Sequence, residues 1–333
     1  MDKKQAAARQ SDVYLELRRS LLPPERVREL SQLRPWRVAV DAAFCWALIV
    51  AAWVMVALEP TWWSVLVAIP IVGTRYYALW VIGHDGLHRR LFPKARHSDL
   101  FGDLFVFAPI GAITRLNNRN HLDHHHHLAT ALDPDRHKHG SFNKTTLLEL
   151  VGFLSGVSSL LRSVRNVFTQ KPKGGSEQAE TRRYTLRDLS ILIAWQVALI
   201  GGLSWAIGFW AWPVLWLFPV YVFTFLGDNA RAFVEHSHPE SDAHADRHRL
   251  VTVTSNPLER VFFAPMHMNL HTAHHLWPSI PYYNLPIAER ELRRFPAARE
   301  IDMRDSYVGY IWRYMRNLRI QDDGSESKSV SST

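Results

Sequence analysis

The chain has 333 residues, 47% of them hydrophobic, which suits either a large soluble domain or a membrane protein with sizeable polar parts. Its formal net charge of +8 comes without a motif that combines basic and aromatic residues for base recognition, so we exclude a nucleic-acid partner and assign the charge to contacts with anionic lipid headgroups. The single cysteine, Cys45, excludes an intramolecular disulfide and a thiolate metal cluster.

Apolar runs in chain order predict four membrane-spanning helices. Residues 42–58 and 62–83 are two such runs, joined by the short turn 59–61. Residues 190–227 contain no Asp, Glu, Lys or Arg, and they are long enough for two more spans around a turn at 208–213, because one span needs about 20 residues. The predicted fold class is an all-α integral membrane protein with four transmembrane helices in two hairpins.

The distribution of basic residues orients these spans. The turns between spans carry no Lys or Arg, whereas residues 3–37 hold many and residues 89–188 are also basic. By the positive-inside rule, both termini and the long middle segment are expected in the cytoplasm. Arg75 lies inside the second span, and we interpret it as reaching toward the headgroups, with a contact to a substrate headgroup as the alternative. The predicted organisation is a cytoplasmic N-terminal segment, a membrane domain and a disordered tail, at residues 1–34, 35–320 and 321–333.

All 18 histidines lie between His84 and His275, and three groups of them have helical spacing. HDGLH, from residue 84, places its histidines four apart, whereas HLDHH, from residue 121, and HTAHH, from residue 271, place them three and four apart. Residues at these spacings lie on one face of a helix. Counting the spans places all three groups in a cytoplasmic helical cap, beside a histidine at the end of the fourth span. The nine candidate ligands are His84, His88, His121, His124, His125, His236, His271, His274 and His275.

Nine imidazoles exceed the three or four ligands of one zinc site, and they suggest two metal ions with open positions. Imidazole suits Zn, Cu, Fe or Ni. Acidic residues that adjoin a candidate ligand are predicted to accept its second ring N–H. These supporting residues are Asp85, Asp123 and Glu235, to which we add Asn269. Of the other histidines, we assign three to the surroundings of the metal site: His126, His127 and His267. We assign the rest to solvated loops: His97, His137, His139, His238, His244 and His248.

These residues resemble the membrane fatty acid desaturase superfamily, in which an HxxxH box is followed by two HxxHH boxes. The similarity covers roughly residues 35–315 and includes the spans, the box order, DPD at 133–135 and MNLHTAHHLWPSIPYYNLP at 268–286. It implies that the nine histidines bind two Fe ions as a non-haem di-iron centre, with His236 as an extra ligand near the end of the fourth span. It also implies that this centre uses O₂ to remove hydrogen from an unactivated C–H bond.

The details of the boxes differ from those of animal acyl-CoA desaturases, front-end desaturases and alkane hydroxylases. They favour a bacterial-type acyl-lipid desaturase, which introduces a double bond into a fatty acyl chain, in the bacterial cell (inner) membrane. Its implied partners are a lipid or fatty acyl substrate and a separate electron donor such as ferredoxin. Carotenoid ketolases share HD followed by two residues and His, so a hydroxylase or ketolase acting on a lipid or carotenoid is the alternative. A non-enzymatic metal carrier ranks last, because it would hold ligands inside its spans, and residues 42–58 and 190–227 contain no histidine.

Overall fold

The computed structural model describes residues 14–128, 132–138, 145–158, 161, 184–236 and 249–330. Among these residues, three helices are long and apolar enough to cross a membrane: α4 (Pro35–Leu58), α5 (Trp62–Leu87) and α11 (Leu186–Ala206). The predicted hairpin of the first two spans corresponds to α4 and α5, and the third span corresponds to α11.

A fourth long helical stretch begins at residue 211, passes through the π-turn η4 (Pro213–Leu217) and ends with α12 (Phe218–His236). The second half of α12 carries Asp228, Arg231 and Glu235, so this helix is less apolar than the other three. The predicted run 190–227 ends just before these charges, whereas the helix continues for nine residues beyond it. The fourth membrane span therefore stays a prediction.

Local sequence explains where the long helices begin. Pro35 occupies the first turn of α4, where its missing N–H costs no hydrogen bond. The Thr61 side chain caps α5 in a reciprocal capping box with Ser64. Thr185 and Asp188 form the same arrangement at the start of α11. These caps satisfy backbone N–H groups that have no partner within the helix.

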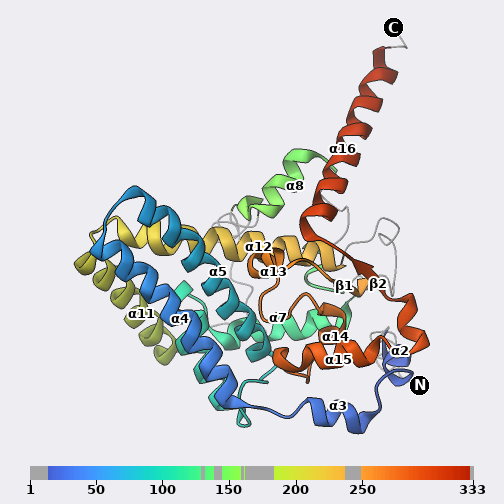
Figure 1. The fold of residues 1–333 in the computed structure, drawn as a ribbon, viewed down its shortest axis with the longest axis horizontal. Helices are drawn as coiled ribbons and strands as arrows, with labels where there is room; N and C mark the ends of the chain where they lie inside the picture. The colour runs from blue at the N-terminus through green and yellow to red at the C-terminus, as the bar shows by residue number, and fades with distance from the viewer. Residues whose placement is uncertain are drawn as a thin grey trace, which may run out of the picture.

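The four long helices lie side by side, with both connecting turns at one end of the bundle and the cap at the other (Figure 1). Trp46 of α4 stacks on Trp195 of α11, with ring centroids 5.3 Å apart. Gly227 lets α12 approach α5, since a Cβ atom there would lie 2.5 Å from the Tyr77 ring. Arg75 is half-buried near the middle of α5, and its place relative to the headgroups stays a prediction.

The cap is built from short elements that surround the end of the bundle where α5 and α12 finish (Figure 1). Between α5 and α11 these elements are α6 (Ala95–Gly102), η1 (Asp103–Phe107), η2 (Ala108–Ile110), α7 (Thr114–His127), η3 (Arg136–Lys138) and α8 (Leu147–Leu154). After α12 they are β1 (Val251–Val253), α13 (Pro257–Phe263), α14 (His271–Leu276), η6 (Tyr282–Asn284), α15 (Leu285–Leu292), η7 (Pro296–Glu300) and β2 (Asp302–Arg304). The long helix α16 (Tyr307–Val330) follows and extends away from the cap (Figure 1).

The cap differs from the predicted all-α fold in one feature. Strands β1 and β2 form a two-stranded parallel sheet, with Val251 paired to Asp302 and Val253 paired to Arg304. Strands of three residues are too short to show an alternating pattern in the sequence. The sheet ties the chain that follows α12 to the chain that precedes α16.

The two ends of the described chain also contact the cap or extend from it. The N-terminal helices α2 (Leu15–Arg19) and α3 (Pro24–Leu30) lie beside α15, where Arg26 pairs with Glu291, Nε to Oε2, at 2.9 Å. The backbone of α16 is helical through residue 330, into the segment predicted to be a disordered tail. Extending a helix by a residue costs less than starting one, so the turns at Tyr307 can propagate into a polar sequence.

Candidate metal centre

The structure brings all nine candidate ligands into two neighbouring groups of imidazoles. In the first group, which we call site A, one ring nitrogen from each of five histidines lies within 4.8 Å of the others: His84, His88, His121, His125 and His274. In the second group, site B, the same holds for His124, His236 and His275. His271 completes site B, because its Nε2 atom lies 3.0 Å from Nε2 of His236 and 2.9 Å from Nε2 of His275.

The helices α7 and α14 each contribute to both sites. On α7, His121 and His125 are four residues apart and belong to site A, whereas His124 belongs to site B. With 3.6 residues per turn, His124 lies about 60° around the helix from His121, on the side opposite to His125. On α14, His274 belongs to site A, and its neighbour His275 belongs to site B. The sequence boxes therefore do not correspond to the two sites.

The donor atoms fit a pair of metal ions. Two nitrogens bound to one ion at about 2.1 Å and a right angle lie about 3.0 Å apart. In site A, Nε2 of His121 lies 2.8 Å from that of His88, and Nε2 of His274 lies 3.1 Å from that of His125. Three or more nitrogens that face one point cannot all be satisfied by hydrogen bonds to each other, whereas one cation can accept a lone pair from each.

The environment keeps six of these imidazoles neutral, as metal binding requires. Burial lowers the pKa of His88 to about 3. Burial, reinforced by neighbouring histidines, also holds the pKa well below its usual range at five other candidate ligands outside the long helices: His121, His125, His271, His274 and His275. At neutral pH these rings therefore offer lone pairs without first releasing a proton.

Hydrogen bonds to Nδ1, the ring nitrogen that points away from the centre, orient two rings of site B. The Nδ1 atom of His124 lies 2.9 Å from Oδ1 of Asp133, and Nδ1–H of His236 donates to the Arg249 carbonyl at 2.9 Å. A proton on Nδ1 leaves the Nε2 lone pair of each ring for the centre. Among the described residues, Nδ1 has no hydrogen-bond partner at His84, His125 and His274 of site A and at His271 of site B.

The predicted supporting residues have varied positions. Glu235 lies near the centre, but its Oε2 is 3.4 Å from Nδ1 of His271 and does not serve the adjacent His236. Asp85 is buried and accepts a hydrogen bond from the Tyr282 backbone N–H at 2.7 Å. Asp123 is exposed on α7. Asn269 donates a hydrogen bond to the Val253 carbonyl at 2.8 Å, and this hydrogen bond supports strand β1.

Sequence reasoning missed Asp133, the buried partner of His124. Asp133 begins the DPD motif, which pointed to the family but received no function. The remaining histidines lie mainly at the surface: His97, His126 and His267 are exposed, and His127 is partly buried. His139, His238, His244 and His248 lie outside the described residues, as does the side chain of His137.

A buried network of charges adjoins site B. Glu235 is fully buried, and its Oε1 accepts a hydrogen bond from the Tyr307 hydroxyl at 2.6 Å. Its Oε2 lies 3.2 Å from Nε of Arg231. Tyr307 stands at the start of α16, so the C-terminal helix is attached directly to the surroundings of the metal centre.

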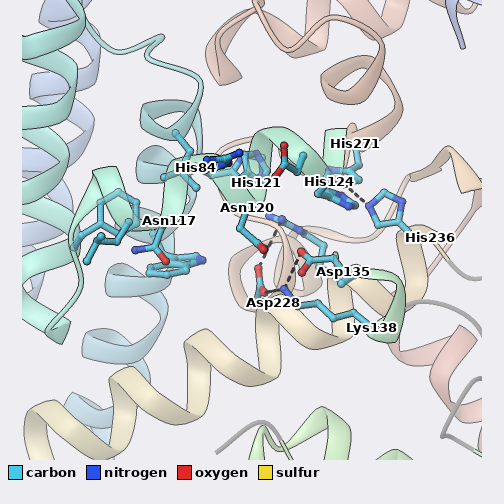
Figure 2. A pocket seen from close by; sticks show the side chains of 18 of the residues that line it. His84, Asn117, Asn120, His121, His124, Asp135, Lys138, Asp228, His236 and His271 are labelled. Atoms are coloured by element: carbon cyan, nitrogen blue, oxygen red, sulfur yellow. Dashed lines mark hydrogen bonds and ion pairs between the residues drawn. The ribbon is translucent and has the colours of Figure 1, made fainter. Parts of the chain in front are cut away.

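A cavity of about 840 Å³ opens beside the two sites and is lined in part by His84, His121, His124, His236 and His271. Figure 2 shows these histidines on one side of the cavity, with Asp135, Lys138 and Asp228 facing them. Lys138 pairs with both acids, at 3.1 Å and 3.7 Å. The lining also includes the apolar side chains of Trp80, Leu87, Phe107 and Leu116. A cavity of this size holds a small molecule or part of a longer chain.

Comparison with known proteins agrees with this geometry. A family model described as fatty acid desaturase matches residues 60–307. An sn-1 oleoyl-lipid 12-desaturase of Picosynechococcus sp. is 24% identical over 300 residues, which cover 81% of this chain and 80% of the relative. An sn-1 oleoyl-lipid 12-desaturase of Arthrospira platensis is 25% identical over 249 residues, which cover 70% of this chain and 69% of the relative.

Proposed function

The chain belongs to the fatty acid desaturase family and is an oxidoreductase, and on that premise we propose that it introduces a double bond into the fatty acyl chain of a membrane lipid. The observation that carries this proposal is the pairing of sites A and B with the adjoining cavity. Neutral imidazoles gather at the cavity wall, and the rest of the lining offers both charged and apolar side chains. A lipid has the same two kinds of surface.

We propose that sites A and B each hold one Fe ion, with five histidines at site A and four at site B. When bound, the two ions supply the oxidising chemistry with O₂. Forming one double bond removes two hydrogen atoms from the chain. Two electrons from a separate donor such as ferredoxin and two protons from the solvent complete the reduction of O₂ to two water molecules.

The protein's own residues hold and position the reactants. Burial keeps the imidazole lone pairs available, and Asp133 and the Arg249 carbonyl fix the orientation of His124 and His236. The cavity must place one methylene beside His84 and His121, because an oxidant that attacks unactivated C–H bonds has little selectivity of its own. We propose that the polar wall, including Lys138, receives the headgroup end of the lipid.

We also propose that residues 211–236 form the fourth membrane span, which completes two hairpins. The charges of α12 lie at its cap end, beside site B, so they need not enter the hydrocarbon core. With this topology both termini and the metal centre lie on one side of the membrane, which we propose is the cytoplasmic side. The membrane that we propose is the bacterial cell (inner) membrane.

The test is mass spectrometry of lipids and pigments from cells that express the protein, with its iron content measured after purification. His124→Ala and His274→Ala each remove a ligand from one site and are expected to abolish turnover and reduce bound iron. His97→Ala, at an exposed residue of α6, is the matched control. Acyl products lighter by two hydrogens support the proposal. A gain of oxygen, or an altered carotenoid with unchanged acyl chains, would instead establish a hydroxylase or ketolase.

A further inference from the structure

The segment 103–113, between α6 and α7, is fixed by side chains from all four long helical stretches. Its π-turn and 3₁₀-turn leave backbone carbonyls without the partners that an α-helix provides. Trp46 of α4 donates to the Phe105 carbonyl at 3.0 Å, and Tyr76 of α5 donates to the Val106 carbonyl. Gln196 of α11 and Trp216 of η4 both donate to the Pro109 carbonyl, at 3.1 Å and 3.3 Å.

The ends and the flank of the segment are fixed as well. The carboxylate of Asp103 accepts hydrogen bonds from the Thr114 backbone N–H at 2.9 Å and from Arg187 at 3.3 Å. Gly83 lets the segment lie directly against α5, since a Cβ atom there would be 2.6 Å from Cγ1 of Val106 and 3.0 Å from the Phe107 ring. The segment therefore has a defined position relative to His84, the next residue of α5.

This segment brings an aromatic ring to the cavity. Phe107 lines the cavity together with Trp80 of α5, and the two rings meet edge to face with centroids 5.4 Å apart. Trp80 is one helical turn before His84, so at about 1.5 Å per residue it lies about 6 Å farther into the bundle. Leu87 and Leu116 add to the apolar part of the lining. The cavity thus has an aromatic boundary on the bundle side of the histidines.

We propose that Trp80 and Phe107 form a wall that limits how far the acyl chain extends past the metal centre and thereby selects the carbon that is oxidised. This inference rests on the proposed function. The wall can act as a sharp stop because the hydrogen bonds of segment 103–113 prevent Phe107 from moving aside. A shorter side chain at residue 107 would let the chain slide deeper, and a different methylene would then lie beside His84 and His121.

The test compares the positions of double bonds and the lengths of product chains between the wild-type protein and two variants, Phe107→Ala and Phe107→Leu. The host is fed fatty acids of several lengths, and the products are analysed by mass spectrometry. One methylene in an apolar pocket changes selectivity by about 10-fold to 200-fold. We therefore expect Phe107→Ala to raise the yield from chains two methylenes longer by at least about tenfold relative to the preferred chain, or to move the double bond. Phe107→Leu should shift the products in the same direction by less.

The matched control is Phe105→Ala, because Phe105 belongs to the same segment but is 42% exposed and does not line the cavity. It should leave the product distribution unchanged. If Phe107→Ala does not accumulate, the Phe107→Leu result decides. Product distributions identical to the wild type, in variants with wild-type iron content, would overturn the inference. A wild-type protein that forms no double bond would instead refute the proposed function, so the two failures are distinguishable.

Discussion

Replacing Asp133 is expected to weaken iron binding although Asp133 is not itself a candidate ligand. Its carboxylate lies 2.9 Å from Nδ1 of His124, and both side chains are almost fully buried. Loss of the hydrogen-bond partner of a metal-binding histidine typically lowers metal affinity 10-fold to 100-fold, which corresponds to about 1.4 to 2.8 kcal/mol. We expect a loss in that range for Asp133→Ala. Asp133→Asn keeps an acceptor oxygen but loses the charge, so its loss should be smaller.

Iron affinity is best measured by competition with a chelator in detergent solution, so that substrate binding does not enter the result. Asp123→Asn is the matched control, because Asp123 is exposed on α7 although it adjoins His124 in the sequence. Its iron affinity should equal that of the wild type. If Asp133→Ala binds iron within about twofold of the wild type, the Asp133 hydrogen bond does not organise site B and the reasoning is refuted.

Three further variants or conditions test the surroundings of the centre. The pKa of His88 is about 3 in the folded protein and about 6.5 in the unfolded chain, so between these pH values only the unfolded chain binds the proton. The melting temperature of the metal-free protein should therefore fall as the pH falls from about 6.5 to about 3. A constant melting temperature would contradict the burial of this ring. Tyr307→Phe removes the buried hydrogen bond to Glu235 and should lower the free energy of unfolding by about 1 to 3 kcal/mol. Denaturant titration measures this change. An unchanged denaturant concentration at the midpoint of unfolding would show that the hydrogen bond does not stabilise the fold. Gly227→Ala forces a Cβ atom against the Tyr77 ring and should destabilise by about 1 to 3 kcal/mol, whereas Gly201→Ala, which meets nothing within 4 Å, should not.

The sequence predicted the candidate ligands because helical spacing is a local property. Residues three and four apart share a helix face wherever the helix lies, so His121, His124 and His125 could be grouped without a structure. The family match over residues 60–307 confirms the predicted resemblance. The sequence could not assign ligands to sites A and B, because that division depends on how α7 and α14 cross. The assignment of His124 and His121 to different sites is visible only when both helices are in place.

Features that depend on tertiary contacts also could not be predicted from the sequence. The Arg249 carbonyl that orients His236 carries no side-chain signal, and Asp133 reaches His124 only after the chain turns at the end of α7. Segment 103–113 has no regular period, because it combines a π-turn with a 3₁₀-turn. The extension of α12 past residue 227 was hidden for a different reason: polar residues end an apolar run even where the helix continues into the cap.

The sharing of α7 and α14 between the sites predicts that the two metal ions bind cooperatively. An ion at site A fixes His121 and His125 of α7 together with His274 of α14, and the same two helices carry three of the four ligands of site B. The second ion therefore binds to helices that are already ordered and meets a lower entropy cost. Titration of the metal-free protein with iron should give a binding curve that is steeper than the curve of two independent sites. His88→Ala removes a ligand from site A alone, and it should lower the affinity of site B as well, by the reciprocity of coupled binding. Two independent binding steps, with site B unaffected by His88→Ala, would show that each site is organised without the other.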